Sequence, residues 1–494
     1  MKLIINKLTI VIVLIFTTIT ISCNKNNGSF TTLEPKDLIE KYHKTYFETN
    51  CFNPKSHFSI FLDYSGSIKT AFKDNNTLGF YQLFINSIKL SSVDFFEVNN
   101  NKIDKIENIS KTELYKKVKE TDRFKGDAAP LNDAVKTIVD NNLAAVFITD
   151  GELWENGERD DPWAREEFEN WLKAGNSIEF FITDYLEFGK QKHIFYICFI
   201  PKNSNNTVVS DFNFYLENSI EAKEYKYAHF CFTANNVKIT KEYNVTNGGV
   251  NENAGIDETA FINGENFEFV FIMNKWKDLY KYIGQSFDIN GNLVPGGAPL
   301  LSHLKVDFSG MEFYNIKDID IVVNNITDDF NKFKTIEEIK ANPPIFATDD
   351  NGQQLLDENR LPILLTPGHY EGYDMNGKLI ADTIFATSEQ NNTIPDLFIL
   401  DKNIYQQNGE ICIKLNDKFS GMGLSSTDMN LLRIDLVLKD VSVNSSNENL
   451  DKFVWQGSKV KENRSMYNSI LGAFNSANPQ NRIIYTYYLY TLPY

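Results

Sequence analysis

Hydrophobic and polar residues follow two different patterns along the chain, and the first pattern covers residues 56–202. Five continuous hydrophobic runs in this region predict buried strands: 57–63, 93–98, 144–150, 178–183 and 194–200. Four intervening segments carry hydrophobic residues at helical spacing: 78–90, 112–120, 131–141 and 162–173. Buried strands separated by helices are typical of a largely parallel sheet that is covered on both faces. The sequence therefore predicts a doubly wound α/β domain over residues 56–202.

The pattern changes after Pro201. Clusters of Asn, Gly and Asp now separate short runs rich in Phe, Tyr, Val and Ile, such as 267–273, 319–323 and 432–438. This texture is typical of antiparallel, sandwich-like domains. A helical stretch that ends at Pro343 and Pro344 predicts a boundary within the region. We therefore expect two β-rich modules, 203–340 and 341–494, the second closing with a helix and a final strand.

The first 22 residues have the pattern of a secretory signal. Lys2 and Lys7 precede an uncharged apolar stretch of 15 residues, 8–22. A helix needs about 20 such residues to span a bilayer, so this stretch matches the core of a signal peptide better than a membrane span. Residues 31–50 then carry hydrophobic residues at helical spacing. We expect a signal peptide at 1–22, followed by a tether and a leading helix at 23–55.

The end of this segment, Thr20-Ile21-Ser22-Cys23, resembles the bacterial lipobox. The resemblance implies that Cys23 is lipidated and becomes the mature N-terminus. Several acyl chains on one residue would hold the protein stably at a membrane. The expected location is then the bacterial cell envelope, anchored in the outer membrane. The alternative is an ordinary signal peptide with an incidental cysteine.

Composition and charge exclude several classes of protein. The chain carries 49 basic and 66 acidic residues, a net charge of −17, which disfavours a nucleic-acid-binding face. A hydrophobic content of 42 % excludes wholesale disorder. The five Cys and six His show neither CxxC nor HExxH spacing, so no zinc signature is present. Nucleophile-elbow and phosphate-loop motifs are also absent from the sequence, and we do not expect an enzyme.

The candidate chemistry lies where two predicted strands end. Asp63-Tyr64-Ser65-Gly66-Ser67 closes the run 57–63, and Thr149-Asp150-Gly151-Glu152 closes the run 144–150. Ligands of open α/β sheets bind at the carboxyl ends of strands. Carboxylate and hydroxyl oxygens at such an edge suit Mg²⁺ or Mn²⁺. Taken singly, the serines also suit turn or helix capping, and Asp150 suits an ordinary turn.

Together, DYSGS and the later TDGE resemble the von Willebrand factor A domain and its metal-ion-dependent adhesion site. The resemblance implies that Asp63, Ser65, Ser67 and Asp150 surround a divalent cation, Mg²⁺ or Mn²⁺. It also implies that an acidic side chain of a protein partner completes the coordination. It covers residues 56–202 only.

The loop at 126–135 resembles the family's Gly-Gly-Thr-Pro-Leu-Tyr-Asp-Ala-Leu pattern, with one difference. Ala129 stands where the family places its metal-binding Thr. Asp127, two residues earlier, is the candidate replacement ligand. The alternative is a weakened or vestigial metal site.

The segment after Asp150 is rich in acidic residues and tryptophan. One interpretation is a surface for the partner, formed by Glu152, Trp154 and Trp163, because aromatic residues beside a site make strong contacts. The other is a solvated helix whose acids lie in its first turn and whose tryptophans pack inward.

Two functions follow from these expectations. The first is a membrane-anchored lipoprotein that binds a protein partner through a divalent-cation-dependent site. The alternative is a structural component of an envelope assembly, with an idle metal site and contacts made by the β modules. Ala129 favours the alternative, while the remaining site residues favour the first.

Overall fold

The computed structural model describes a large part of the chain, within which two compact units can be recognised. The described residues are 31–46, 57–100, 102–126, 128–154, 158–202, 204–233, 237–241, 262–263, 266–272, 276, 286–287, 293–294, 299–366, 372–374, 378–380, 392–416, 420–457 and 461–494. The small unit combines Met1–Lys44 with Ile326–Asn391, and the large unit combines Thr45–Asn325 with Asn392–Tyr494. The predicted signal peptide, Cys23 and Asp127 lie outside the described residues.

The small unit is built on two helices that are far apart in the sequence, α2 (Pro35–Tyr46) and α10 (Thr327–Ala341). The ring of Tyr42 meets Phe330 and Phe333 edge to face, with centroid distances of 5.2 and 5.3 Å. Beside these rings, Lys41 forms an ion pair with Glu337. A short hairpin, β15 (Ile345–Phe346) and β16 (Leu364–Thr366), follows α10. The leading helix predicted from hydrophobic spacing is confirmed over Pro35–Tyr46.

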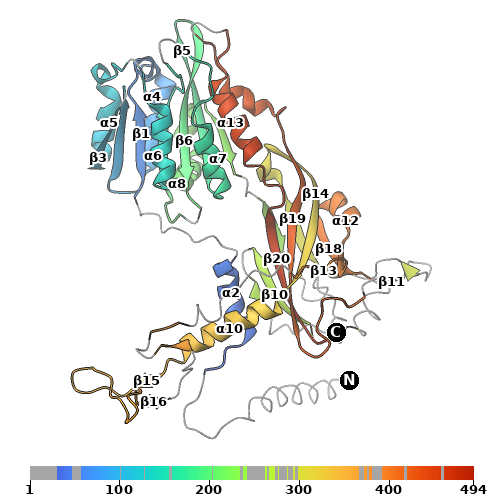
Figure 1. The fold of residues 1–494 in the computed structure, drawn as a ribbon. Coiled ribbons are helices and arrows are strands. Elements are labelled where there is room, and N and C mark those ends of the chain that lie inside the picture. Colours follow the sequence, from blue (N-terminus) through green and yellow to red (C-terminus); the bar gives the residue numbers. More distant parts are fainter. Residues whose placement is uncertain are drawn as a thin grey trace. The chain divides into compact units, whose positions relative to one another are not determined.

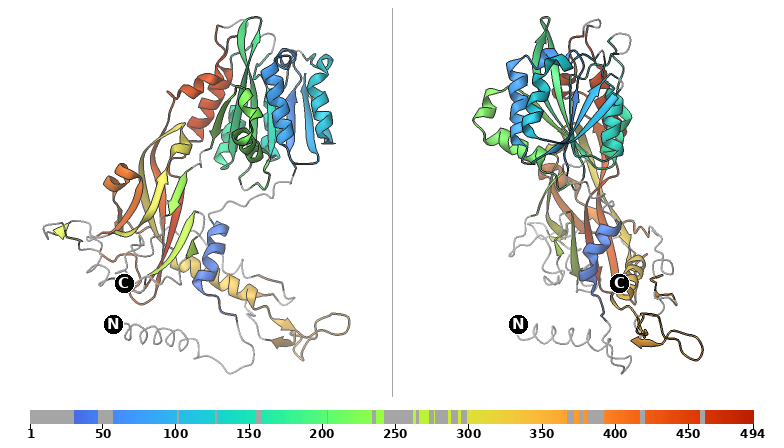
Figure 2. Two further views of the ribbon diagram at one scale, coloured as in Figure 1. Left: turned by 180° about the vertical axis from the view of Figure 1, so that it is seen from behind. Right: turned by 90° about the vertical axis from the view of Figure 1, so that its left-hand side faces the viewer.

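The first part of the large unit is a seven-stranded sheet in the order β3-β2-β1-β4-β6-β5-β7. Its strands are β1 (Ser59–Asp63), β2 (Val93–Asn99), β3 (Lys102–Ile109), β4 (Ala145–Thr149), β5 (Ser177–Glu187), β6 (Lys190–Ile200) and β7 (Ala228–Phe232). Its helices are α3 (Ile68–Ala71), α4 (Asn75–Ser87), α5 (Lys111–Lys119), α6 (Leu131–Asp140), α7 (Arg165–Lys173) and α8 (Val208–Asn218). Helices lie on both faces of this sheet (Figure 1 and Figure 2).

Strand β1 shows why the sheet needs cover on both sides. All five of its residues are buried. Ile60 and Leu62 point into one hydrophobic cluster, which α4, α5 and α8 complete. Phe61 points into the opposite cluster, which contains α6 and α7. Successive side chains of a strand point to opposite faces, so a continuous hydrophobic run requires two covering layers.

The expectation of a largely parallel sheet is wrong. Among the described strands, the parallel pairs in this sheet are β1–β2 and β1–β4, and the remaining pairs are antiparallel. The reason lies in a hairpin. Strands β5 and β6 are joined by Phe188 and Gly189, with φ of 50° and 79°, and a two-residue turn permits only antiparallel pairing. The predicted end at residue 202 is also too early, because β7 extends the sheet to Phe232.

The rest of the large unit contains a five-stranded sheet, β14-β19-β20-β10-β9, and a four-stranded sheet, β17-β18-β13-β8. These strands are β8 (Lys238–Lys241), β9 (Ile262–Asn263), β10 (Phe267–Ile272), β13 (Pro299–Asp307), β14 (Tyr314–Asn325), β17 (Phe398–Leu400), β18 (Glu410–Leu415), β19 (Asn430–Val443) and β20 (Ile483–Thr491). Within the described strands of these two sheets, β10–β20 is the parallel pair. A further short hairpin joins β11 (Ser286–Phe287) and β12 (Leu293–Val294).

The predicted boundary between modules 203–340 and 341–494 is wrong. Strand β14 lies before this boundary and pairs along its length with β19, which lies after it. The chain leaves the large unit at Asn325 and returns at Asn392, where the Asn325 N–H donates to the Asn392 carbonyl at 2.9 Å. The helical stretch near residue 340 therefore belongs to an insertion between two strands, rather than to a linker between two modules.

Two further helices belong to the large unit, α12 (Lys402–Asn408) and α13 (Ser465–Ser476). Helix α13 agrees with the helix predicted near the C-terminus and packs against α7. The Ser469 hydroxyl of α13 accepts the backbone N–H of Trp163 at 2.8 Å. Across the described part of the chain, no helix is both long enough and apolar enough to cross a membrane.

Candidate functional site

The candidate site lies at the carboxyl ends of β1 and β4. These strands are parallel neighbours, with Leu62 in register with Ile148. Asp63 is the last residue of β1, and Asp150 directly follows β4. Parallel neighbours end at the same edge of a sheet, so the two aspartates share one rim. The structure thus brings to one rim the two carboxylates for which the sequence predicted a shared edge of the sheet.

Hydrogen bonds around Asp63 hold the first loop against the second. The Ser65 N–H donates to Asp63 Oδ1 at 2.7 Å, and the Thr149 hydroxyl donates to Asp63 Oδ2 at 2.8 Å. The Thr149 oxygen in turn accepts the Gly151 N–H at 3.0 Å. The hydroxyl oxygens of Ser65 and Ser67 lie 3.1 Å apart. Asp63, Ser65 and Ser67 are therefore gathered in one tight turn that Thr149 connects to the end of β4.

A third loop closes on the first through Gly126. Its carbonyl accepts the Gly66 N–H at 3.0 Å, and its own N–H donates to the Tyr64 carbonyl at 3.3 Å. A Cβ atom at position 126 would collide with Asn99 Oδ1. A side chain at this position would therefore have to displace Asn99 and would press against the Tyr64 carbonyl, 3.2 Å away, where the two loops approach. Asp127, the proposed replacement ligand on this loop, lies outside the described residues, and the methyl group of Ala129 supplies no ligand oxygen.

The two aspartates differ in how well the protein solvates them. Both are buried, with relative exposures of 1 % for Asp63 and 2 % for Asp150. Burial raises the pKa of Asp63, hydrogen bonds from Ser65 and Thr149 lower it in part, and the charge of Glu152 adds a smaller rise. Burial raises the pKa of Asp150 well above its ordinary value and the charges of Glu152 and Asp63 raise it further, while hydrogen bonds from the Ser67 hydroxyl and the Glu152 N–H lower it in part. The surroundings thus disfavour the ionised form of Asp150 more strongly than that of Asp63.

One oxygen of Asp150 is an unsatisfied acceptor. Its Oδ1 accepts the Glu152 N–H at 3.1 Å. Its Oδ2 is buried and finds no hydrogen-bond partner among the described residues. A buried carboxylate oxygen without a partner costs free energy, and a cation is the ligand that would compensate it.

Glu152 does not face solvent. Its side chain is 2 % exposed and forms an ion pair with Lys192, whose side chain is 3 % exposed. Its second carboxylate oxygen accepts the indole N–H of Trp154 at 3.1 Å. Trp154 itself is half-buried.

The predicted partner surface is therefore wrong for Glu152 and Trp163. Trp163 is 1 % exposed, and its ring packs 5.9 Å from the ring of Phe168. Trp171 is equally buried. The inward-packing interpretation holds for both tryptophans, because α7 and α13 cover this face of the sheet and remove large aromatic side chains from water.

Two residues of the site went unnoticed in the sequence, Lys192 and Tyr185. They face each other across the β5–β6 hairpin. The Tyr185 hydroxyl is buried without a hydrogen-bond partner in the described part of the chain. Burial raises its pKa, and the charges of Asp150, Glu152, Glu187 and Asp63 add to the rise, which places the hydroxyl near the site. The available signal was a lysine and a tyrosine flanking a short turn beside hydrophobic runs.

The residues at this edge suit a divalent cation. Two buried carboxylates, the hydroxyls of Ser65 and Ser67, and the unsatisfied Asp150 oxygen offer hard oxygen donors. Within the described ranges, no group of three or more His, Cys, Asp or Glu residues is placed to share a metal. A cation here would accordingly depend on the serine hydroxyls and on water for the rest of its coordination.

Comparisons with models of known protein families, with curated proteins and with solved structures found no match.

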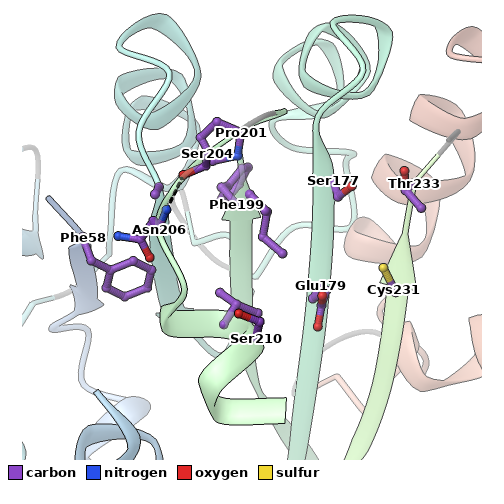
Figure 3. A pocket seen from close by; sticks show the side chains of 13 residues that line it. Phe58, Ser177, Glu179, Phe199, Pro201, Ser204, Asn206, Ser210, Cys231 and Thr233 are labelled. Atoms are coloured by element: carbon purple, nitrogen blue, oxygen red, sulfur yellow. Dashed lines mark hydrogen bonds between the residues drawn. The ribbon is translucent and has the colours of Figure 1, made fainter. Parts of the chain in front are cut away.

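A cavity of about 440 Å³ opens at the opposite end of the sheet, beside Phe58, which precedes β1, and Pro201, which follows β6 (Figure 3). Glu179 lines it and accepts hydrogen bonds from Asn213 at 2.8 Å and His229 at 2.9 Å. Burial, with smaller effects from Glu179 and Glu312, raises the pKa of the Cys231 thiol to about 12. A thiol that stays protonated is a poor nucleophile, so this cavity offers no activated cysteine.

Proposed function

We propose that this protein binds a protein partner through a divalent cation held at the carboxyl ends of β1 and β4. The observation that carries the proposal is the buried, unsatisfied Oδ2 of Asp150 beside the carboxylate of Asp63. Two acidic side chains buried at one rim are costly to keep for structure alone. An oxygen-seeking cation such as Mg²⁺ or Mn²⁺ would relieve that cost.

Each residue would have a distinct part in holding the cation. Asp63 and Asp150 would supply charge, and the hydroxyls of Ser65 and Ser67 would supply neutral oxygens. Thr149 would position Asp63 through its hydrogen bond of 2.8 Å. The bound cation would supply a coordination position for an acidic side chain of the partner.

The proposal includes the wider family and location. We assign the α/β domain to the von Willebrand factor A type, with the antiparallel β5–β6 hairpin as a departure from the family pattern. The five- and four-stranded sheets would form a sandwich-like region. Lipidation at Cys23 would anchor the protein in the outer membrane of a bacterial cell envelope.

A structural role in an envelope assembly is the second candidate. It is favoured by Ala129, because the methyl group at this position provides no ligand. In that case the rim would be an inherited feature without a cation, and the β-rich region would make the contacts.

Thermal unfolding of the purified protein with Mg²⁺ or Mn²⁺ and with EDTA separates the two candidates. A cation at 100 times its dissociation constant stabilises a protein by about 2.7 kcal/mol. For a domain of this size, that corresponds to a rise in Tm of roughly 5–10 °C. Ser67→Ala should abolish the rise, because the Ser67 hydroxyl is a proposed ligand.

The matched control is Ser92→Ala, which removes an exposed hydroxyl 3.5 Å from Asn108, outside the proposed cation site. It should retain the full rise in Tm. An unchanged Tm of the wild-type protein in Mg²⁺ and Mn²⁺ would overturn the proposal and favour the structural role.

A further inference from the structure

A buried ion pair lies next to the proposed cation site. The carboxylate of Glu152 pairs with the ammonium of Lys192, and both side chains are almost fully buried. Strand β6 pairs with β4 up to Thr149, which is in register with Phe195. Lys192 precedes Phe195 by three residues, and because β6 runs antiparallel to β4, it lies beyond the carboxyl end of β4, where Asp150 follows.

Glu152 is held by its neighbours rather than left available to a cation. One of its oxygens pairs with Lys192, and the other accepts the Trp154 indole N–H at 3.1 Å. It is nevertheless close to the rim, because its backbone N–H donates to Asp150 Oδ1 at 3.1 Å. Glu152 thus adds negative potential to the rim without offering a free oxygen.

Lys192 counters part of that potential. Asp63, Asp150 and Glu152 carry three formal negative charges, and the ammonium compensates one of them. Glu187 is half-buried on the same β5–β6 hairpin as Lys192, and it contributes a further negative charge at the margin of the site. In a buried site, a single positive charge changes the potential felt by a divalent cation strongly.

We propose that Lys192 is a resident counter-charge that sets the affinity of the rim for divalent cations. It stabilises the cation-free protein by neutralising Glu152, and it lowers cation affinity by opposing the charge of an incoming ion. The inference rests on the proposed function of the same site. Lys192 is then a positioning residue that acts through Glu152 and through the electrostatic field.

The test is a cycle of Lys192→Met, Glu152→Gln and the double variant, titrated with Mn²⁺ by calorimetry. Lys192→Met leaves three uncompensated charges and should bind Mn²⁺ about tenfold more tightly than wild type. Glu152→Gln leaves Lys192 facing the two aspartates and should bind about tenfold more weakly. The double variant restores the wild-type net charge and should bind within about threefold of wild type.

Thermal unfolding in EDTA gives a second readout. Lys192→Met should lower Tm, because it leaves Glu152 buried without its partner, and the double variant should recover much of that loss. Lys414→Met is the matched control, since it breaks the ion pair between Lys414 on β18 and Asp401 at the start of α12, 2.8 Å apart and outside the proposed site. It should leave Mn²⁺ affinity unchanged.

The outcomes separate the two proposals. If wild type binds Mn²⁺ and Lys192→Met binds it equally, the role of Lys192 is overturned while the cation site stands. If only Lys192→Met binds, the counter-charge role stands and the proposed function of the native rim fails. If no variant binds, both fail. Weak binding by the double variant would make Glu152 itself a ligand and would also overturn the inference.

Discussion

Asp150→Asn should stabilise the cation-free protein, although Asp150 belongs to the proposed site. The Asp150 carboxylate is 2 % exposed, has an oxygen without a partner in the described chain, and lies in the field of Glu152 and Asp63. An amide keeps the acceptor for the Glu152 N–H and removes a buried negative charge. Removal of this buried charge, which Glu152 and Asp63 repel, should raise the free energy of unfolding by about 1–2 kcal/mol.

Asp63→Asn is the matched comparison, because Asp63 is equally buried and its oxygens are already used. The Ser65 N–H and the Thr149 hydroxyl donate to its two oxygens. An amide group cannot accept both hydrogen bonds, so the free energy of unfolding of this variant in EDTA should be about 1 kcal/mol lower than that of wild type. Both variants should lose the rise in Tm caused by Mg²⁺ or Mn²⁺.

The assay is thermal unfolding followed by tryptophan fluorescence in EDTA and in excess Mg²⁺. Three of the five tryptophans, Trp154, Trp163 and Trp171, belong to the α/β domain, so the signal reports largely on it. A stabilisation of 1–2 kcal/mol should raise Tm by roughly 2–8 °C. A lower Tm for Asp150→Asn than for wild type in EDTA would refute the electrostatic reasoning.

Two further predictions concern acid stability and loop packing. Burial raises the pKa of Asp401, but hydrogen bonds from Lys414 and from backbone amides at the start of α12 outweigh this effect and lower the pKa below 3.8. The ionised Asp401 therefore stabilises the folded protein, and this contribution is lost as the pH falls through that range. Asp401→Asn, which keeps a helix-capping side chain, should lower the free energy of unfolding by about 0.5–1 kcal/mol at pH 7 and leave it unchanged near pH 2. Urea unfolding measures this difference, and an equal loss at both pH values would contradict the assignment. Gly126→Ala should lower the free energy of unfolding by about 1–3 kcal/mol, because the alanine Cβ would collide with Asn99 and lie 3.2 Å from the Tyr64 carbonyl. An unchanged Tm would show that the loops can separate.

Much of the α/β domain could be predicted from local patterns. Continuous hydrophobic runs become strands only when both faces are covered, and β1 and β4 are buried along their whole lengths. A polar residue directly after such a run must lie at the strand's end. For that reason Asp63 and Asp150 could be assigned to a sheet rim without knowledge of the fold.

Other features depended on contacts between distant segments. The periodicity of hydrophobic residues reveals which residues share one face of a helix or strand. It does not reveal which distant segment packs against that face. The pairing of α2 with α10 and the burial of Trp163 beneath α13 join segments about 300 residues apart, as in the Trp163–Ser469 hydrogen bond. The inserted small unit escaped prediction for the same reason, because its helix resembled a linker when read alone.

The sequence by itself determined the buried strands β1, β2, β4, β5 and β6 of the α/β domain with four of its helices, and which oxygen-bearing side chains stand at the ends of two of these strands. These properties follow from local spacing and from the requirement to bury hydrophobic side chains. The tertiary structure decided that β6 enters the sheet antiparallel beside β4 and so delivers Lys192 to Glu152, 40 residues away. No local pattern encodes that pairing, because the order of strands is set by the packing of the whole domain.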